Sequence, residues 1–240
     1  MISIVIPAKD EAENLKLLLP RLKKALSPLK DKYSFEIIIV CDNCSDDTEK
    51  VAKLIGVMTL RRTKDPGKSR ALCDGFRKAK GNILVMMDAD LSHLPEELPR
   101  MIRKLLSSSK IGLVIASREL GRSDDTTPIR RFGGLVFNFW TNFFFGTKLS
   151  DAINGYKIFY RKVFDNYEYT ANGYAIEIEL VANTARMGMK TAEIPSYEAP
   201  RATGVAKSKI IKDGWLFSKE IFTEGIAYEL EKAAEWIRKL

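Results

Sequence analysis

The sequence is poor in the residues that build disulfide scaffolds or zinc sites. It has three cysteines, Cys41, Cys44 and Cys73, in 240 residues. They give no even disulfide framework and no paired motifs with zinc spacing, so we expect reduced thiols in a cytosolic protein. A redox role for Cys41-x-x-Cys44 is the alternative. That pair, however, leads into SDDT, a stretch typical of a substrate-binding loop.

Long apolar runs, repeats and low-complexity tracts are also missing. No apolar run reaches the length of about 18 residues that a membrane span requires. The chain starts directly with the strand-like MISIVIPA, so we expect no signal peptide. With no linker visible, we expect one domain, residues 1–210, followed by a C-terminal helical extension, residues 211–240.

The composition is that of an ordinary globular protein with an excess of positive charge. Apolar residues make up 45% and charged residues 29%, and a chain of 240 residues buries a sizeable core without disulfides or structural metals. The net charge of +8 favours an anionic partner, which could be phosphate groups, an acidic membrane face or nucleic acid. We expect no nucleic-acid partner, because no nucleic-acid-binding motif accompanies the charge.

Short apolar runs alternate with amphipathic helical stretches through the first half. Apolar runs without polar alternation indicate a parallel sheet covered on both faces, and strand–helix alternation indicates a doubly wound α/β fold. Ligands of such sheets bind at the carboxyl ends of the strands. Acidic residues follow two of the runs at that end, Asp42 after IIIVC and both Asp88 and Asp90 after ILVMM. The predicted strands are SIVIP, FEIIIVC, VMTLRR, NILVMMD and IGLVIAS.

Asp88 and Asp90 admit two interpretations. If the strand continues that far, residues i and i+2 face the same side, and the two carboxylates could hold Mg²⁺ or Mn²⁺. The alternative is a turn in which Ser92 caps the following helix. The two are compatible, since Ser92 can cap the helix while the aspartates bind metal.

Four motifs in order resemble family 2 glycosyltransferases of the GT-A fold. They are VIPAKDEAENL, VCDNCSDDT, PGKSRALCDGFRKAKGNILVMMDADLSHLPEE and DAINGYK. The resemblance is strongest to dolichyl-phosphate mannose synthases and other polyprenyl-phosphate sugar synthases, and it covers roughly residues 2 to 210. It implies a GT-A type, mostly parallel sheet with helices on both faces, followed here by a C-terminal amphipathic helix.

The resemblance also implies a donor site and an acceptor site. The D-x-D pair, Asp88 and Asp90, holds the metal and the nucleoside diphosphate sugar, and Asp90 is counted as catalytic. Arg118 and Arg130 are catalytic residues that bind the acceptor phosphate, for which a planar, permanently charged guanidinium is suited, and Arg131 is a third acceptor-binding residue. A surface salt bridge is the alternative role for Arg130. The remaining donor-site residues are Pro7, Glu11, Asp42, Lys68, Arg201 and Lys207.

The chain departs from the family pattern at several positions. An asparagine before Glu11 is replaced by Asp10, and the serine and arginine that usually follow the second phosphate-binding arginine are Gly134 and Leu135. Ala206 stands where a serine precedes the basic-loop lysine. The changes at residues 134 and 135 bear on the acceptor more than on the donor.

The implied reaction is an inverting, metal-dependent transfer of a sugar, expected to be mannose, from a nucleoside diphosphate sugar (GDP-mannose or UDP-glucose) to a polyprenyl phosphate. An acceptor phosphate is already anionic, so no general base is needed, in keeping with a chain whose one histidine, His93, we expect to be structural. The alternative is transfer from UDP-glucose to a hydroxyl group, which requires a carboxylate base, and Glu179 is the candidate.

The aromatic segment Phe132–Phe145 has two interpretations, as buried core or as an interfacial helix that meets a lipid substrate. The tail places Phe222, Ile226, Leu230, Ala233, Ile237 and Leu240 on one helix face. We therefore expect a peripheral protein on the cytoplasmic face of a membrane surface, with a membrane-anchoring subunit as a further partner.

Overall fold

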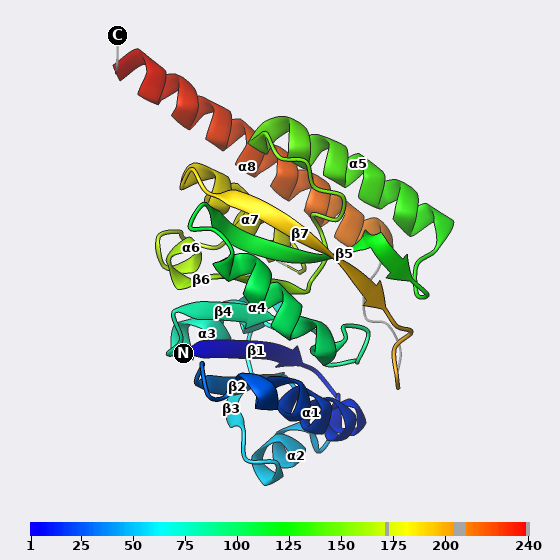
Figure 1. Cartoon of the computed structure of the whole chain (residues 1–240). Coiled ribbons are helices and arrows are strands. Elements are labelled where there is room, and N and C mark those ends of the chain that lie inside the picture. The colour runs from blue at the N-terminus through cyan, green and yellow to red at the C-terminus, as the bar shows by residue number, and fades with distance from the viewer. Residues whose placement is uncertain (171–172, 204–209, 239–240) are drawn as a thin grey trace.

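The computed structural model describes residues 1–170, 173–203 and 210–238. Its centre is a seven-stranded sheet in the order β3-β2-β1-β4-β6-β5-β7 (Figure 1). The strands are β1 Ile2–Ala8, β2 Phe35–Asp42, β3 Met58–Arg62, β4 Ile83–Met86, β5 Ile111–Ser123, β6 Lys157–Tyr160 and β7 Lys190–Glu198. The helices are α1 Ala12–Leu26, α2 Thr48–Leu54, α3 Lys68–Lys78, α4 Leu98–Leu106, α5 Pro128–Phe145, α6 Arg161–Asp165, α7 Ile176–Arg186 and α8 Ile210–Arg238, with short 3₁₀ turns at Ser27–Leu29 and Pro95–Glu97.

Helices cover both faces of the sheet, so the prediction of a doubly wound α/β fold is confirmed. Ile4 and Ile6 of β1 pack into one hydrophobic cluster with α1, α2 and α4, whereas Val5 packs into a second with α3 and α7. This alternation follows from the period of two along a strand. Both sides of β1 are buried, which explains its unbroken apolar sequence.

Strand β6 is the exception to the parallel arrangement. It lies between β4 and β5 and pairs antiparallel with both, while β5 pairs parallel with β7. An antiparallel strand begins at the edge where its parallel neighbours end. The segment that leads into β6, Asp151–Tyr156, is therefore brought to the carboxyl ends of β4 and β5.

Helix α5 carries an exposed apolar face. Thr127 caps its start and Gly146, with φ of 61°, ends it in the left-handed conformation. Phe145 is buried, but Phe132, Phe139 and Phe143 are 62–68% exposed. The core interpretation of this segment thus holds for Phe145 and is wrong for the other three.

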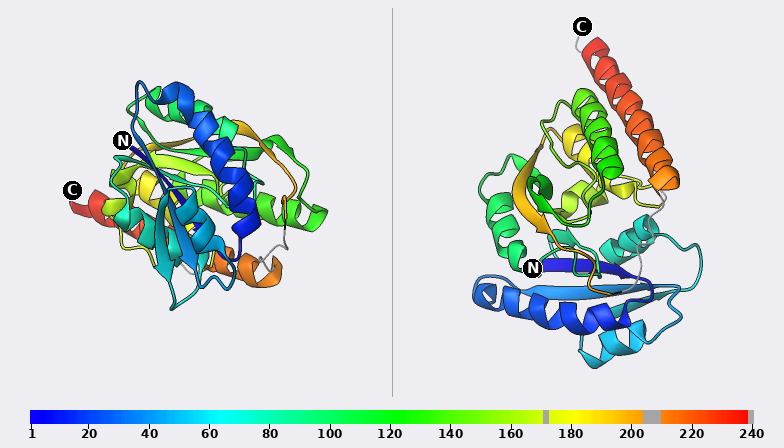
Figure 2. Two further views of the ribbon diagram at one scale, coloured as in Figure 1. Left: turned by 90° about the horizontal axis from the view of Figure 1, so that it is seen from below. Right: turned by 90° about the vertical axis from the view of Figure 1, so that its right-hand side faces the viewer.

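Helix α8 packs along α5 and over α7, and its C-terminal end projects past the body of the molecule (Figures 1 and 2). It buries Phe217, Ile221 and Glu224. The apolar residues that the sequence placed on one helix face are exposed at Phe222, Ile226, Leu230 and Ile237; Leu240 lies outside the described residues. In the described residues no helix combines the length and apolarity that crossing a bilayer requires.

Gly225 sets the distance between α8 and α5. A Cβ at this position would lie 2.3 Å from Cγ of Phe144, whereas a Cβ at Gly214 of the same helix meets nothing closer than 3.8 Å. We expect Gly225→Ala to lower the free energy of unfolding by about 1–3 kcal/mol through overpacking. Gly214→Ala is the matched control and should raise it by about 0.5–1 kcal/mol, because alanine favours the helix. Chemical denaturation of the two variants checks this, and equal effects would contradict it.

Three carboxylates meet between α7 and α8, contributed by Glu179, Glu220 and Glu224. Glu224 is paired with Arg186 and accepts a hydrogen bond from Tyr167. Burial, followed by the charge of Glu224, raises the pKa of Glu220 from 4.5 to about 7. Between these two values the folded chain holds a proton at Glu220 that the unfolded chain has lost, so the contribution of this group to stability decreases as pH rises.

We expect Glu220→Gln to remove this pH dependence. The variant should match the wild type below about pH 4 and melt several degrees higher above pH 7, where the wild-type carboxyl is ionised. Thermal unfolding followed between about pH 4 and pH 8 measures it. Glu235→Gln, at an exposed position of the same helix, is the control and should run parallel to the wild type at every pH.

Candidate active site

A cavity of about 1060 Å³ opens at the carboxyl ends of β1, β2, β4 and β5. Its wall also includes the first residues of α3, α5, α7 and α8. The structure brings together at this cavity all but one of the predicted donor-site, acceptor-site and metal-site residues; the exception, Lys207, lies outside the described residues. The lining residues from the predicted set are Pro7, Glu11, Asp42, Lys68, Asp88, Asp90, Arg118, Arg130, Arg131 and Arg201.

Asp88 and Asp90 lie beyond the strand, since β4 ends at Met86 and Leu91 has φ of 66°. The condition under which the two carboxylates would face the same side as strand neighbours is therefore not met. The turn interpretation is correct in part: the amide and the hydroxyl of Ser92 both donate to Oδ1 of Asp90, at 3.0 and 2.6 Å. Ser92 caps no helix, because the next turn begins after Leu94 without a side-chain cap.

Arg201 draws the segment after β7 across the site. Its Nη2 lies 2.9 Å from Oδ2 of Asp90 and its Nη1 lies 3.0 Å from Oε1 of Glu11. The amide of Ala202 donates to the carbonyl of Asp90, and that of Ala199 to the carbonyl of Ser92. This strap joins the ends of β1, β4 and β7 and leaves one guanidinium between two carboxylates of the cavity.

Asp42 is held by cationic and backbone partners. Arg62 Nη1 donates to its Oδ1, and the amide of Gly67 donates to its Oδ2 at 2.7 Å. Arg62 also reaches Asp74, so one guanidinium links β2, β3 and α3. A ligand at Asp42 would share a carboxylate that these partners already orient.

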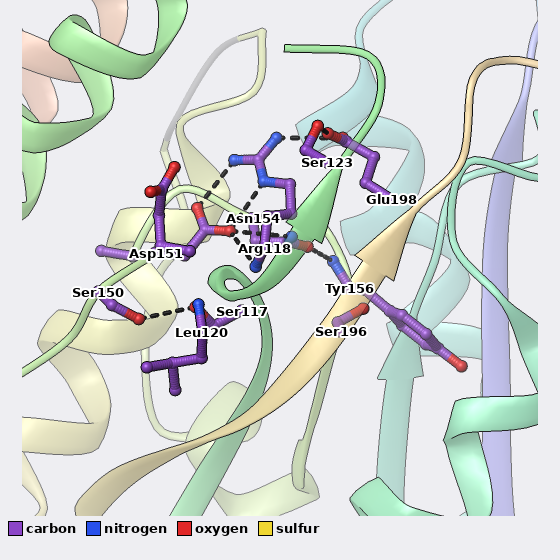
Figure 3. Close-up of polar contacts among 12 residues, drawn as sticks. Ser117, Arg118, Leu120, Ser123, Ser150, Asp151, Asn154, Tyr156, Ser196 and Glu198 are labelled. Atoms are coloured by element: carbon purple, nitrogen blue, oxygen red, sulfur yellow. Dashed lines mark hydrogen bonds and ion pairs between the residues drawn. The ribbon is translucent and has the colours of Figure 1, made fainter.

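Arg118 stands between two carboxylates at the end of the buried part of β5 (Figure 3). Its Nε donates to Oδ2 of Asp151 and its Nη2 to Oδ1, both at 2.8 Å, and its Nη1 donates to Glu198 at 3.1 Å. Burial alone would raise the pKa of Asp151, but the hydrogen bonds and charge of Arg118 outweigh it, and the pKa is lowered. A guanidinium has five N–H donors, so this one keeps donors beyond those three bonds.

Arg130 and Arg131 lie in the first turn of α5, which contains no acidic residue. Arg130 Nη1 lies 4.0 Å from Oδ2 of Asp125, and Arg131 Nε lies 3.3 Å from Oε2 of Glu119. The side chain of Arg131 is 65% exposed and that of Arg130 33%. The helix dipole makes such a terminus favourable for an anion.

His93 supports the D-x-D turn. It is buried, accepts a hydrogen bond on Nδ1 from the amide of Asp88 at 3.2 Å, and stacks on Tyr156 at a centroid distance of 5.1 Å. These contacts agree with the expected structural role.

Sequence reasoning missed Glu177, which lines the cavity, and named Glu179 instead. Two residues apart on a helix are about 200° apart around its axis, so the two side chains leave α7 in different directions. Glu179 lies beside Glu220 and Glu224 of α8, and its Oε1 accepts a hydrogen bond from the amide of Thr170, which precedes α7. The signal in the sequence was an acid within the apolar run AIEIELVA, but the sequence carried two such acids and no means to choose between them.

The donor set at the D-x-D turn fits a hard divalent cation. Asp88 and Asp90 offer carboxylate oxygens, and Mg²⁺ and Mn²⁺ are commonly held by one or two carboxylates together with substrate phosphates. Both carboxylates already attract cations: Lys68 Nζ lies 2.8 Å from Oδ1 of Asp88, and Arg201 pairs with Asp90.

Comparison with known proteins agrees with this geometry. Residues 3–168 match the family model of glycosyl transferase family 2. A dolichol-phosphate mannosyltransferase of Pyrococcus furiosus is 30% identical over 214 residues, which cover 87% of this chain and 59% of the relative, so this chain spans less than two thirds of that protein. An undecaprenyl-phosphate mannosyltransferase of Micrococcus luteus is 29% identical over 216 residues, 85% of either chain.

Among solved structures, glucosyl-3-phosphoglycerate synthase from Mycobacterium tuberculosis superimposes with a TM-score of 0.72 at 21% identity, covering 95% of this chain and 79% of that one. At this identity the likeness concerns the fold, and it confirms the expected GT-A architecture. The family model covers more than half of the sequence and includes β1, β2 and the D-x-D turn. The chain belongs to glycosyl transferase family 2 and is a glycosyltransferase.

Proposed function

We propose that the protein transfers a sugar, mannose from GDP-mannose in the first instance, to a polyprenyl phosphate, with a divalent metal at Asp88 and Asp90. The observation that carries the proposal is the continuity of one cavity from the D-x-D turn through Arg118 and Arg130 to Phe132 on the apolar face of α5. The names of both relatives describe transfer to a polyprenyl phosphate.

On the donor side, the cations around the D-x-D turn suit a diphosphate. Arg201 and Lys68 flank the two aspartates, and a metal bound there would neutralise the charge that develops on the departing nucleoside diphosphate. Pro7 and Glu11 line the same cavity from the end of β1, and Asp42 lines it from β2. These residues would hold the nucleoside.

On the acceptor side, guanidinium groups and the start of α5 suit a phosphate monoester. Arg118 is oriented by Asp151 and Glu198, and Arg130 lies where the helix dipole favours negative charge. The acceptor oxygen is anionic at neutral pH, so these residues need only align it with the anomeric carbon. In-line attack inverts the anomeric configuration.

The exposed apolar faces of α5 and α8 would meet the membrane that carries the lipid. Phe139 and Phe143 of α5 are 62% and 66% exposed, and Trp215 and Trp236 of α8 are 70% and 65% exposed. Exposed apolar area of this kind, together with the net charge of +8, suits the anionic cytoplasmic face of a bilayer or a membrane-anchoring subunit.

The first experiment offers purified protein radiolabelled GDP-mannose or UDP-glucose, each with Mn²⁺ and with a polyprenyl phosphate in detergent. We expect label from GDP-mannose to enter the lipid fraction, and none to enter when the free polyprenol replaces its phosphate. Metal-dependent nucleotide binding without lipid labelling would overturn the phosphate acceptor and favour a hydroxyl acceptor. Absence of any nucleotide binding would overturn the donor site.

A separate measurement tests the membrane surface. Phe139→Ser combined with Phe143→Ser should reduce sedimentation with anionic liposomes at least about tenfold, because two exposed aromatic side chains that would insert into the bilayer are lost. Nucleotide binding should remain unchanged, since neither residue lines the cavity. Leu54→Ser, at a residue of α2 that is 78% exposed, is the matched control and should leave sedimentation at the wild-type level.

A further inference from the structure

Lys68 forms an ion pair with Asp88, the first aspartate of the D-x-D turn. Lys68 Nζ lies 2.8 Å from Oδ1 and 3.1 Å from Oδ2 of Asp88, and 3.2 Å from Oε1 of Glu177. The three side chains come from the start of α3, the loop after β4 and the start of α7. The ammonium therefore covers both oxygens of Asp88 and is shared with a second carboxylate.

The residues around the ammonium group of Lys68 enclose a site for one cation. A Cβ at Gly155 would lie 2.7 Å from Lys68 Nζ and 3.4 Å from both Asp88 Oδ2 and Glu177 Oε1, so this loop covers the cluster with bare backbone. The ring of Tyr174 lies 5.2 Å from Nζ, within cation–π distance. The side chain of Lys68 is 13% exposed and that of Glu177 2%.

The charges are stabilised together. Burial by itself would lower the pKa of Lys68, but Asp88 and Glu177 outweigh it and the pKa is raised. Burial raises the pKa of Glu177, and its Oε2 is buried without a hydrogen-bond partner in the described part of the chain. Glu177 thus has an unused acceptor beside the ammonium that Asp88 also holds.

We propose that Lys68 is a resident cation that competes with the divalent metal for Asp88, and that Glu177 is the positioning residue that retains the ammonium when the metal displaces it. The inference rests on the proposed metal-dependent donor site. A nucleoside diphosphate adds a further acceptor for the displaced ammonium, since Lys68 lines the same cavity. Metal and nucleotide would then favour each other's binding through Lys68.

The test compares two affinities that should move in opposite directions. In Lys68→Met, the affinity for Mn²⁺ without nucleotide, measured from the electron paramagnetic resonance signal of free Mn²⁺, should increase about tenfold because a competing unit charge is removed. The affinity for GDP at saturating Mn²⁺, measured by calorimetry, should fall about tenfold because a cation beside the diphosphate is lost. A change of both affinities in the same direction, or of neither, overturns the proposal.

Lys78→Met is the matched control. It removes the same charge from the exposed end of the same helix, ten residues and about 15 Å further on, where salt screens the interaction. Both affinities should stay within about twofold of the wild type. A response equal to that of Lys68→Met would reduce the effect to net charge and overturn the proposal.

Glu177→Gln tests the positioning role. In the wild-type background it should weaken Mn²⁺ binding, because Lys68 loses its second anchor and stays on Asp88. In the Lys68→Met background the same substitution should have little effect on Mn²⁺ binding. This non-additivity distinguishes an action through Lys68 from a direct electrostatic effect of the Glu177 charge on the metal. The double variant buries neither charge of the pair, so it stays measurable if Lys68→Met fails to fold. Additive effects would overturn the role of Glu177.

A failure of the donor site gives a different result. If the wild type binds neither GDP nor UDP, the proposed function fails, while the Mn²⁺ titration still decides whether Lys68 competes for Asp88.

Discussion

Replacing Asp90 by alanine should lower sugar transfer by roughly 10³-fold, the effect expected when a group that supports transition-state charge is removed. Asp90 binds Arg201 through Oδ2 and the amide and hydroxyl of Ser92 through Oδ1. The substitution therefore removes a proposed metal ligand and releases the strap after β7. Label entering the lipid fraction measures the activity, and the signal of free Mn²⁺ measures metal binding.

Asp90→Asn separates the two contributions. An asparagine keeps an oxygen for Ser92 but removes the negative charge that pairs with Arg201. We expect it to fold like the wild type and to lose transfer to the same extent as the alanine variant. Transfer above about one tenth of the wild-type rate would contradict a role for this charge at the reaction centre.

The second large effect concerns stability. Arg118→Met should lower the free energy of unfolding by about 2–4 kcal/mol, because Asp151, whose side chain is 4% exposed, loses the guanidinium that neutralises it. Denaturant unfolding at pH 7 measures this. Arg122→Met, at a position of β5 that is 74% exposed and paired with Asp124, is the control and should leave the free energy of unfolding close to the wild-type value.

The pH dependence of that loss follows from the lowered pKa of Asp151. A carboxyl whose pKa is lowered by folding stabilises the protein above its unfolded pKa, and this contribution is lost as pH falls. The difference between Arg118→Met and the wild type should therefore be largest near neutral pH and decrease below about pH 4. A difference that is independent of pH would show that packing, and not the ion pair, accounts for the loss.

The arginines of the site also hold elements of the fold together through ion pairs. Arg118 joins β5 to the segment before β6 through Asp151 and to β7 through Glu198. Arg201 joins Glu11 to Asp90 in the same manner. We therefore expect variants of either residue to change stability as well as transfer, and activity should be compared at equal folded fractions.

The sequence by itself determined the class of fold and the edge of the sheet that carries the site. Unbroken apolar runs such as Ile83–Met86 report burial on both sides of a strand, which is a local property. Asp42, Asp88 and Asp90 directly follow such runs, so their place at the carboxyl edge was predictable from order along the chain. The ordered motifs added the family, because four short patterns in sequence are more specific than any one of them.

Only the tertiary structure decided which side chains meet. The antiparallel insertion of β6 brings Gly155 and Asp151 to the site, and no periodicity in a four-residue strand reveals its direction. The choice of Glu177 over Glu179 for the cavity depends on how α7 is rotated against the sheet. A window of sequence reports how strongly a residue prefers burial, but the partner of a buried charge lies across a long chain separation and is set by packing.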